Sequence, residues 1–219
     1  MKLRQKLYLT VLLLIFTILL GAVAIQSGVR KSFLVFRDAL ELPAVTVDGR
    51  TLTLQDMAFY IAYEEQQIEE KAFIYNPAST REYWNLYTNY TYIRDKGKQT
   101  VMDMAIHDEI FYQMALEEGV ELSGEEERHL ANTQYDFWSD LGEQQREELG
   151  VSEDVLRESM RKIAIAEKYQ YLLAAMEDGA FEEYSVTGET YGELLKTHLY
   201  EVEKSVWDRV HFGEITLKH

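Results

Sequence analysis

The chain has no cysteine and only two prolines among its 219 residues. Without cysteine it forms no disulfide, no thiolate nucleophile, no cysteine-ligated metal site and no cysteine-linked lipid anchor. It also lacks internal repeats and low-complexity tracts. The scarcity of proline, together with 47% hydrophobic residues, favours a helical protein over a loop-rich one.

Basic residues are scarce and unevenly distributed. Six of the 22 Lys and Arg residues lie in residues 1–37, which contain no Asp or Glu, so the rest of the chain has 16 basic and 38 acidic residues and a formal charge of −22. An acidic surface repels phosphates, which argues against a nucleic-acid partner. It attracts basic polypeptides or a cationic wall, although solubility alone also accounts for it.

The N-terminal segment has the pattern of an export signal. Leu7 to Ile25 form an uncharged run of 19 residues, preceded by the cations Lys2, Arg4 and Lys6. As a helix this run is about 28 Å long, close to the thickness of a bilayer's hydrocarbon core. We therefore predict a signal peptide or signal-anchor transmembrane helix over residues 1–30, with its N-terminus inside, and a juxtamembrane linker over residues 31–43.

Two fates of this segment stay open. The small residues in Ala22-Val23-Ala24 fit a signal-peptidase site, and cleavage after Ala24 would release a secreted protein. However, the apolar run continues through Ile25 and is longer than the hydrophobic region of a usual cleaved signal. This favours a single-pass protein of the cell membrane with an extracytoplasmic C-terminal domain.

The chain after the linker predicts a mostly helical domain that begins with a short β-hairpin. Val45 to Val47 and Thr51 to Thr53 flank Asp48-Gly49, a dipeptide typical of type I′ hairpin turns. Thr53 is then expected to cap a helix that has Asp56 near its positive end.

Five further helices are predicted from apolar residues at helical spacing and from capping residues. They are expected after Thr80, between Gly97 and Gly119, after Ser123, between Ser152 and Gly179, and from Tyr191 to Val206. The helix before Gly119 has the wide apolar face of a central core helix. The last is a C-terminal closing helix, and residues 211–217 are expected to form a short strand that pairs with the Val45 strand.

Two motifs resemble the N-terminal domain of SurA/PrsA-type extracytoplasmic folding factors. Val45-Thr46-Val47-Asp48-Gly49 with Thr53-Leu54-Gln55-Asp56 matches the family's strand, Asn/Asp-Gly turn and helix start, and Ala115 to Glu126 matches its helix end, Gly and Ser-x-x-Glu start. The resemblance covers residues 44–176. It implies a SurA N-like helical chaperone domain over residues 44–178, with residues 179–219 packing back on it as a helix and short strand.

The same resemblance also bears on whether the chain has prolyl isomerase activity. In that family a parvulin-type isomerase domain, with paired histidines and a Gly-rich stretch, often follows the helical domain. Here 40 residues follow Gly179, and His198 and His211 lack the rest of that constellation. We therefore expect no isomerase domain, no catalytic residue and no cofactor.

Two groups of titratable residues are expected to be structural. His107, Asp108 and Glu109 are consecutive on a helix and point in different directions, so they converge poorly on a metal or substrate. The acidic residues of Glu125 to Glu127 lie in the first turn of a helix, where they favour its dipole. No metal site is predicted.

Aromatic residues are the stronger signal for function. The chain has 15 Tyr, many of them between residues 60 and 92. Tyr and Trp combine a large apolar face with a polar tip, which suits recognition of extended chains. We predict a peptide-binding surface formed by Tyr60, Tyr63, Phe73, Tyr75, Tyr83, Trp84 and Tyr87, and packing in the core is the alternative role for each.

Together these features predict a membrane-anchored extracytoplasmic chaperone-like protein. Its partners would be unfolded or exported polypeptides, held without covalent catalysis, and the membrane, contacted through the N-terminal helix. Two alternatives stay open: a member or accessory of the peptidyl-prolyl isomerase family, and a surface scaffold that binds one dedicated partner. Binding of many unfolded peptides would distinguish the chaperone from the scaffold.

Overall fold

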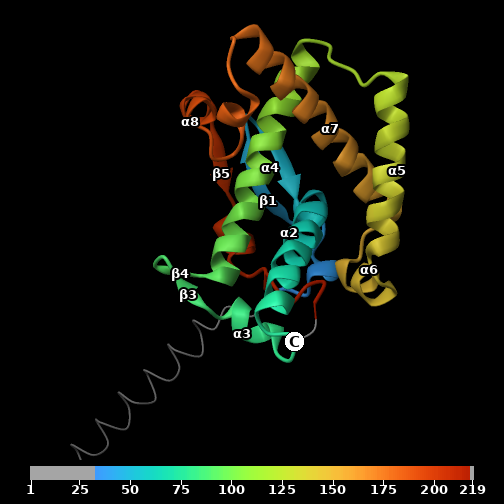
Figure 1. Ribbon diagram of the computed structural model, residues 1–219, viewed down its shortest axis with the longest axis vertical. Coiled ribbons are helices and arrows are strands. Elements are labelled where there is room, and N and C mark those ends of the chain that lie inside the picture. Colours follow the sequence, from blue (N-terminus) through green and yellow to red (C-terminus); the bar gives the residue numbers. More distant parts are fainter. Residues whose placement is uncertain (1–32, 218–219) are drawn as a thin grey trace, which may run out of the picture. The chain divides into compact units, whose positions relative to one another are not determined.

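The computed structural model describes residues 33–217, and from Leu34 onward the chain forms one compact unit (Figure 1). The predicted export segment over residues 1–30 lies outside the described residues. The described part is mostly helical with a small antiparallel sheet, as predicted. None of its helices is both long and apolar enough to cross a membrane.

The elements are arranged around a three-stranded sheet with the order β2-β1-β5 and a separate β3–β4 hairpin. Along the described residues they are η1 (Phe36–Asp38), β1 (Pro43–Val47), β2 (Arg50–Thr53), α2 (Leu54–Tyr75), α3 (Thr80–Trp84), β3 (Tyr87–Thr88), β4 (Thr91–Tyr92), α4 (Ile93–Glu117), α5 (Gly124–Asp140), α6 (Glu143–Leu149), α7 (Glu153–Met176), η2 (Phe181–Tyr184), α8 (Glu189–Leu195), β5 (Tyr200–Val202) and α9 (Lys204–Trp207).

The predicted N-terminal hairpin is confirmed. β1 pairs antiparallel with β2, with Val47 opposite Arg50. Asp48 (φ 47°) and Gly49 (φ 84°) adopt the left-handed conformation that a type I′ turn requires. At the start of α2 the Thr53 backbone N–H donates to Asp56 Oδ2 over 2.8 Å, which is half of the capping box.

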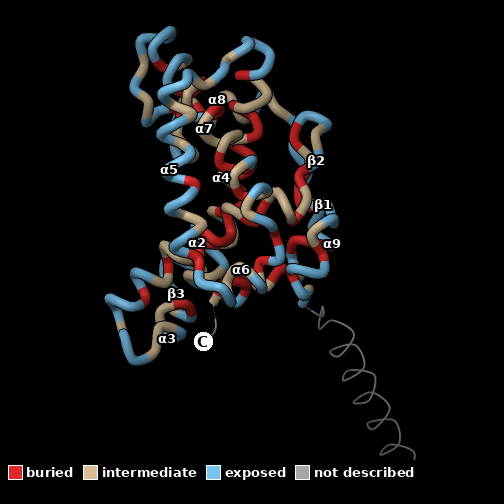
Figure 2. The backbone as a smooth tube through the Cα atoms, turned by 90° about the vertical axis from the view of Figure 1, so that its right-hand side faces the viewer, coloured by how far each residue is buried: buried red, intermediate tan, exposed pale blue. Residues whose placement is uncertain are grey.

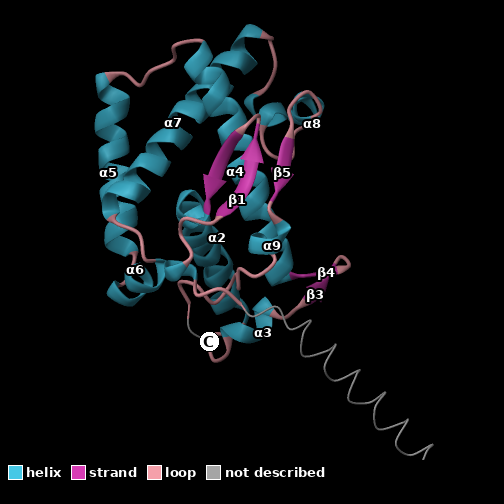
Figure 3. Ribbon diagram, turned by 180° about the vertical axis from the view of Figure 1, so that it is seen from behind, coloured by secondary structure: helices cyan, strands magenta, loops and turns pink. Residues whose placement is uncertain are grey.

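The predicted closing helix from Tyr191 to Val206 is wrong. The helical spacing holds through α8, which ends at Leu195, and the chain then becomes extended as β5 before the short α9. β5 lies along the free edge of β1, as Figure 3 shows. Its backbone groups satisfy those of β1, and this gain overrides a helix preference that is weak at β-prone Tyr200 and Val202.

The strand that pairs with Val45 is therefore not the one predicted. Val202 of β5 lies opposite Val45, so the expected pairing of residues 211–217 with β1 is also wrong. Those residues instead form turns that pack beneath α2 and α4, where Phe212 is 1% exposed. The C-terminal region still folds back onto the helices, but through a strand and a buried loop.

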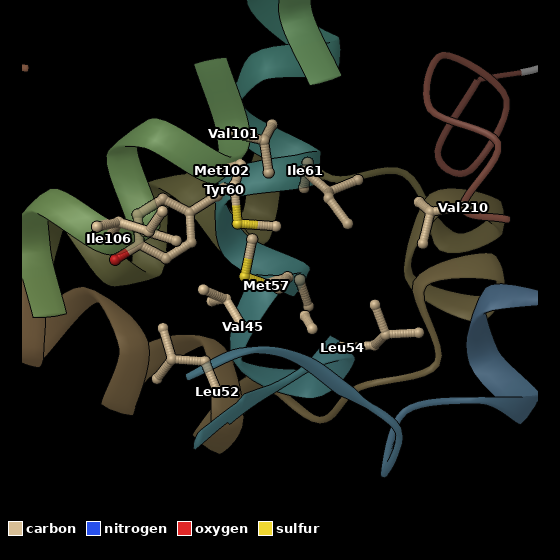
Figure 4. Packing of buried hydrophobic residues seen from close by; sticks show 14 of the residues in the cluster. Val45, Leu52, Leu54, Met57, Tyr60, Ile61, Val101, Met102, Ile106 and Val210 are labelled. Atoms are coloured by element: carbon tan, nitrogen blue, oxygen red, sulfur yellow. The ribbon is translucent and has the colours of Figure 1, made fainter. Parts of the chain in front are cut away.

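The core lies where α2 and α4 meet β1 and β2, and α7 covers the other side of α4 (Figure 2). Figure 4 shows Met57 of α2 between Met102 of α4 and Val45 of β1. The central role predicted for the helix before Gly119 is confirmed, since α4 contacts α2, α7 and the sheet. α7 in turn packs against the outer helix α5.

Gly97 in α4 gives the C-terminal loop room to pack. A Cβ atom there would lie 2.6 Å from Phe212 Cε1 and would also collide with Ile68. Phe212 in turn packs edge-on against Trp84, with ring centroids 5.8 Å apart. The close approach of three elements at this point thus requires a residue without a side chain.

We expect Gly97→Ala to lower the free energy of unfolding by about 1–3 kcal/mol, the usual cost of overpacking a core. The matched control is Gly192→Ala in α8, where the added Cβ meets no atom within 4 Å. There the change should be neutral or stabilising by up to about 1 kcal/mol, because alanine is the better helix former. Denaturant titrations followed by tryptophan fluorescence would measure both, and equal effects would contradict the packing described.

Candidate functional site

An open groove of about 740 Å³ lies between α5 and α7, which are close at their lower ends and diverge toward the top of the view in Figure 1. Its apolar lining comes mainly from Leu122, Leu130, Met160, Ile163, Ala164 and Leu172. α5, whose residues are all described, buries Gln134 alone. It therefore touches α7 along a narrow line and leaves apolar side chains of α7 uncovered.

Hydrogen bonds and an aromatic contact connect α5 to α7 and to α2. At one end the Gln134 side-chain amide donates to the Arg157 carbonyl over 2.8 Å, and Phe137 packs on Phe59 with ring centroids 4.9 Å apart. At the other end Lys168 Nζ donates to Glu126 Oε2 over 2.7 Å. Between these contacts Arg161 of α7 also donates to Glu127 Oε1, so several polar links connect the two helices that form the groove.

The rim of the groove is acidic. It is lined by Glu125, Glu126 and Glu167, and Lys168 forms an ion pair with Glu126. Hydrogen bonds from Lys168 and Ser123 lower the pKa of Glu126 to about 2, so this carboxylate is ionised at neutral pH. Burial and the nearby Asp108 raise the pKa of Glu167. Among the described residues no Lys or Arg forms an ion pair with Glu125 or Glu167, so the rim attracts cations.

The seven aromatic residues predicted to bind peptides do not form one surface. Tyr60 and Trp84 are buried at 8% and 3% exposure, so neither is available to a partner in this structure. Tyr63 is exposed and stacks on Phe59, a groove-lining residue, with ring centroids 5.9 Å apart. The others lie toward the far end of α2, on α3 and on β3: Phe73, Tyr75, Tyr83 and Tyr87.

Sequence reasoning missed the groove because α5 and α7 form it from segments far apart in the chain. One signal was present: Met160, Ile163 and Ala164 follow the i, i+3, i+4 spacing of a helix face, and Leu172 extends it. This face is wider than the sparse apolar residues of α5 can cover. An unmatched apolar face of this kind predicts a binding surface.

His107 is buried and acts as a structural link. Its Nδ1 lies 2.7 Å from Asp108 Oδ1, and its Nε2 lies 2.9 Å from the Tyr184 carbonyl, which ties α4 to η2. Glu109 lies 3.3 Å from Arg50 of β2 and so ties α4 to the sheet. Within the described residues no three His, Asp or Glu side chains gather as they would around a metal ion.

Glu65 is a second feature that the sequence did not reveal. Its buried carboxylate accepts hydrogen bonds from the backbone N–H of Gly213, Ile215 and Thr216, and from the Thr216 hydroxyl, at 2.6–3.3 Å. Burial raises the pKa of Glu65, and these hydrogen bonds oppose that rise. The carboxylate fastens the C-terminal loop to α2.

Comparisons of the chain with known protein families, curated proteins and solved structures give no match.

Proposed function

We propose that the chain is a membrane-anchored extracytoplasmic chaperone-like protein that holds unfolded or exported polypeptides without covalent catalysis. The observation that carries this proposal is the open apolar groove between α5 and α7 with its carboxylate rim. Folded polypeptides hide their apolar side chains, whereas unfolded ones present them, so such a groove selects for the unfolded state.

The groove suits short extended segments of many sequences. Its volume of about 740 Å³ falls within the range of small-molecule sites, and it holds a few side chains rather than a folded surface. The acidic rim adds attraction for Lys and Arg beside the apolar residues of a client.

The order of local elements supports membership of the SurA/PrsA type as part of this proposal. β1, the Asp48-Gly49 turn, β2 and the capped α2 follow one another as in that family's N-terminal domain. The second motif supports it as well, since the Ser123 hydroxyl accepts from the Glu126 N–H and the Glu126 carboxylate accepts from the Ser123 N–H. The uncharged run from Leu7 to Ile25 supports the membrane anchor.

The test is suppression of aggregation by the full chain in nanodiscs. Several unrelated unfolded clients are diluted from denaturant, and light scattering is followed at one chain per client. We expect delayed aggregation for most clients and none with empty nanodiscs of the same lipid. Absence of delay for every client would sink the proposal, and capture of one folded protein alone would establish a scaffold instead.

A further inference from the structure

We propose that the end of the domain formed by α3, the β3–β4 hairpin and the start of α4 lies on an anionic bilayer surface. This contact is additional to the groove and rests on the membrane anchoring in the proposed function. The ligand class is a layer of anionic lipid headgroups.

The segment of residues 71–98, which forms most of this end, differs in charge from the rest of the domain, and Glu69 and Glu70 border it beside Phe73. Residues 71–98 contain five basic and two acidic residues, whereas the remainder of residues 38–219 contains 11 basic and 36 acidic residues. Lys71, Arg81 and Lys96 are exposed. Of the two acids, Glu82 accepts a hydrogen bond from Asn76 over 2.9 Å. A net positive segment on a strongly acidic protein is complementary to anionic lipid.

Exposed tyrosines gather at the same end. In the β3–β4 hairpin Tyr87 and Tyr92 pack edge-on with ring centroids 5.1 Å apart, and Tyr90 at the turn is 94% exposed. Asn89 (φ 49°) and Tyr90 (φ 67°) hold the left-handed turn that carries this ring outward. Tyrosine is the residue type that suits a membrane–water interface, because its ring is apolar and its hydroxyl stays hydrated.

An apolar patch continues this surface onto α2. Phe73, Ile74 and Tyr75 at the end of α2 are 61%, 83% and 55% exposed. Tyr75 packs against Tyr83 of α3 with ring centroids 5.6 Å apart, which joins the patch to the hairpin. Basic and aromatic side chains side by side are the composition of an interfacial membrane contact.

The chain enters the domain at this end. The Leu34 N–H donates to the Arg209 carbonyl over 3.0 Å, and Lys98 Nζ, in the second turn of α4, donates to the Val210 carbonyl over 2.7 Å. Seven residues separate Ile25 from Phe33. Even fully extended they span no more than about 28 Å. In an anchored chain this short connection limits the distance between Ile25 and the point where the domain begins.

Charge also argues against a client polypeptide as the occupant of this surface. The acidic groove favours basic clients, and the same clients would be repelled by residues 71–98. The basic aromatic end therefore contacts lipid, and the acidic groove binds the client.

The absence of cysteine makes a site-specific test direct. Tyr90→Cys carries a spin label in the full chain, reconstituted in liposomes with and without phosphatidylglycerol. The matched control is Leu116→Cys, an exposed apolar residue 23 positions after the first residue of α4 and so about 35 Å from the hairpin end of that helix. With anionic lipid we expect the Tyr90 label to be at least fivefold less accessible than the Leu116 label to a water-soluble nickel reagent, and more accessible to oxygen.

A second variant tests the charge. Arg81→Glu with Lys96→Glu should return the Tyr90 label to the accessibility of the Leu116 label. Equal accessibility of the two labels in the unmodified background would overturn the proposal, and so would protection of Tyr90 that requires an added unfolded client. Alkaline carbonate extraction of the same liposomes reports the anchor, and the aggregation assay reports the chaperone activity, so each failure is seen separately.

Discussion

Glu65→Ala is expected to lower the free energy of unfolding by about 3–5 kcal/mol. The substitution leaves three backbone N–H groups and one hydroxyl without their acceptor, and each buried unsatisfied donor costs about 1–3 kcal/mol before relaxation. If the C-terminal loop is released into water, its donors are hydrated and the total free-energy cost is smaller. The release also removes the packing of Phe212, which adds to the cost. Denaturant titration of the full chain, followed by tryptophan fluorescence, measures the loss.

Two companion variants show that the effect comes from the buried acceptor. Glu70→Ala, on the same helix but exposed, should change stability by no more than about 0.5 kcal/mol. Glu65→Gln should also destabilise, because its amide group points N–H donors at the donors of Gly213 or Thr216. A Glu65→Ala chain as stable as the Glu70→Ala chain would contradict this account.

The protonation of Glu65 gives a further signature within the same experiment. Burial raises its pKa in the folded state above the ordinary 4.5. In the pH range just above 4.5 the native state then binds more protons than the unfolded state, so wild-type stability falls as pH rises through that range. Glu65→Gln lacks this group, and its stability should lose that part of the pH dependence.

Local signals in the sequence predicted much of the fold correctly. The Asp48-Gly49 hairpin, the Thr53 cap and the Ser123 box each depend on residues within a few positions of one another. The central position of α4 followed from its wide apolar face, which only a helix surrounded by others can bury. These features were predictable because their physical causes lie within single segments.

The errors and omissions have long-range causes. The amphipathic spacing from Tyr191 to Val206 was compatible with a helix, and the free edge of β1 that draws β5 into the sheet lies about 150 residues earlier in the chain. Glu65 is one of several acids in α2, and its four donors lie 148–151 residues away. Periodicity cannot distinguish it from its exposed neighbours.

The candidate site illustrates the same limit. Composition and spacing drew attention to the aromatic residues, and they fall into separate environments, from buried Tyr60 to exposed Tyr87. The groove instead depends on how little of α7 is covered by α5. That shortfall is a property of two helices together, and neither sequence segment reveals it alone.

Filling the groove is expected to weaken client binding at least tenfold. In Ala164→Trp the new ring occupies the space between α5 and α7, while Ala175→Trp adds the same ring to an exposed position of α7 outside the groove. Exclusion of one client side chain from an apolar site costs about 1.5–3 kcal/mol, which is tenfold to more than a hundredfold in affinity. Fluorescence anisotropy with a labelled, unfolded peptide rich in Leu and Lys measures the dissociation constant.

Reversing the rim charge distinguishes a selective groove from a generally sticky surface. Glu125→Lys with Glu167→Lys should weaken binding of the basic peptide and strengthen binding of a peptide in which Glu replaces Lys. Glu189→Lys with Glu201→Lys makes the same change in net charge at exposed positions away from the groove. High salt should reduce the difference between the two peptides, because it screens exposed charges. An unchanged affinity in Ala164→Trp, or equal effects of both charge reversals, would place client binding elsewhere on the molecule.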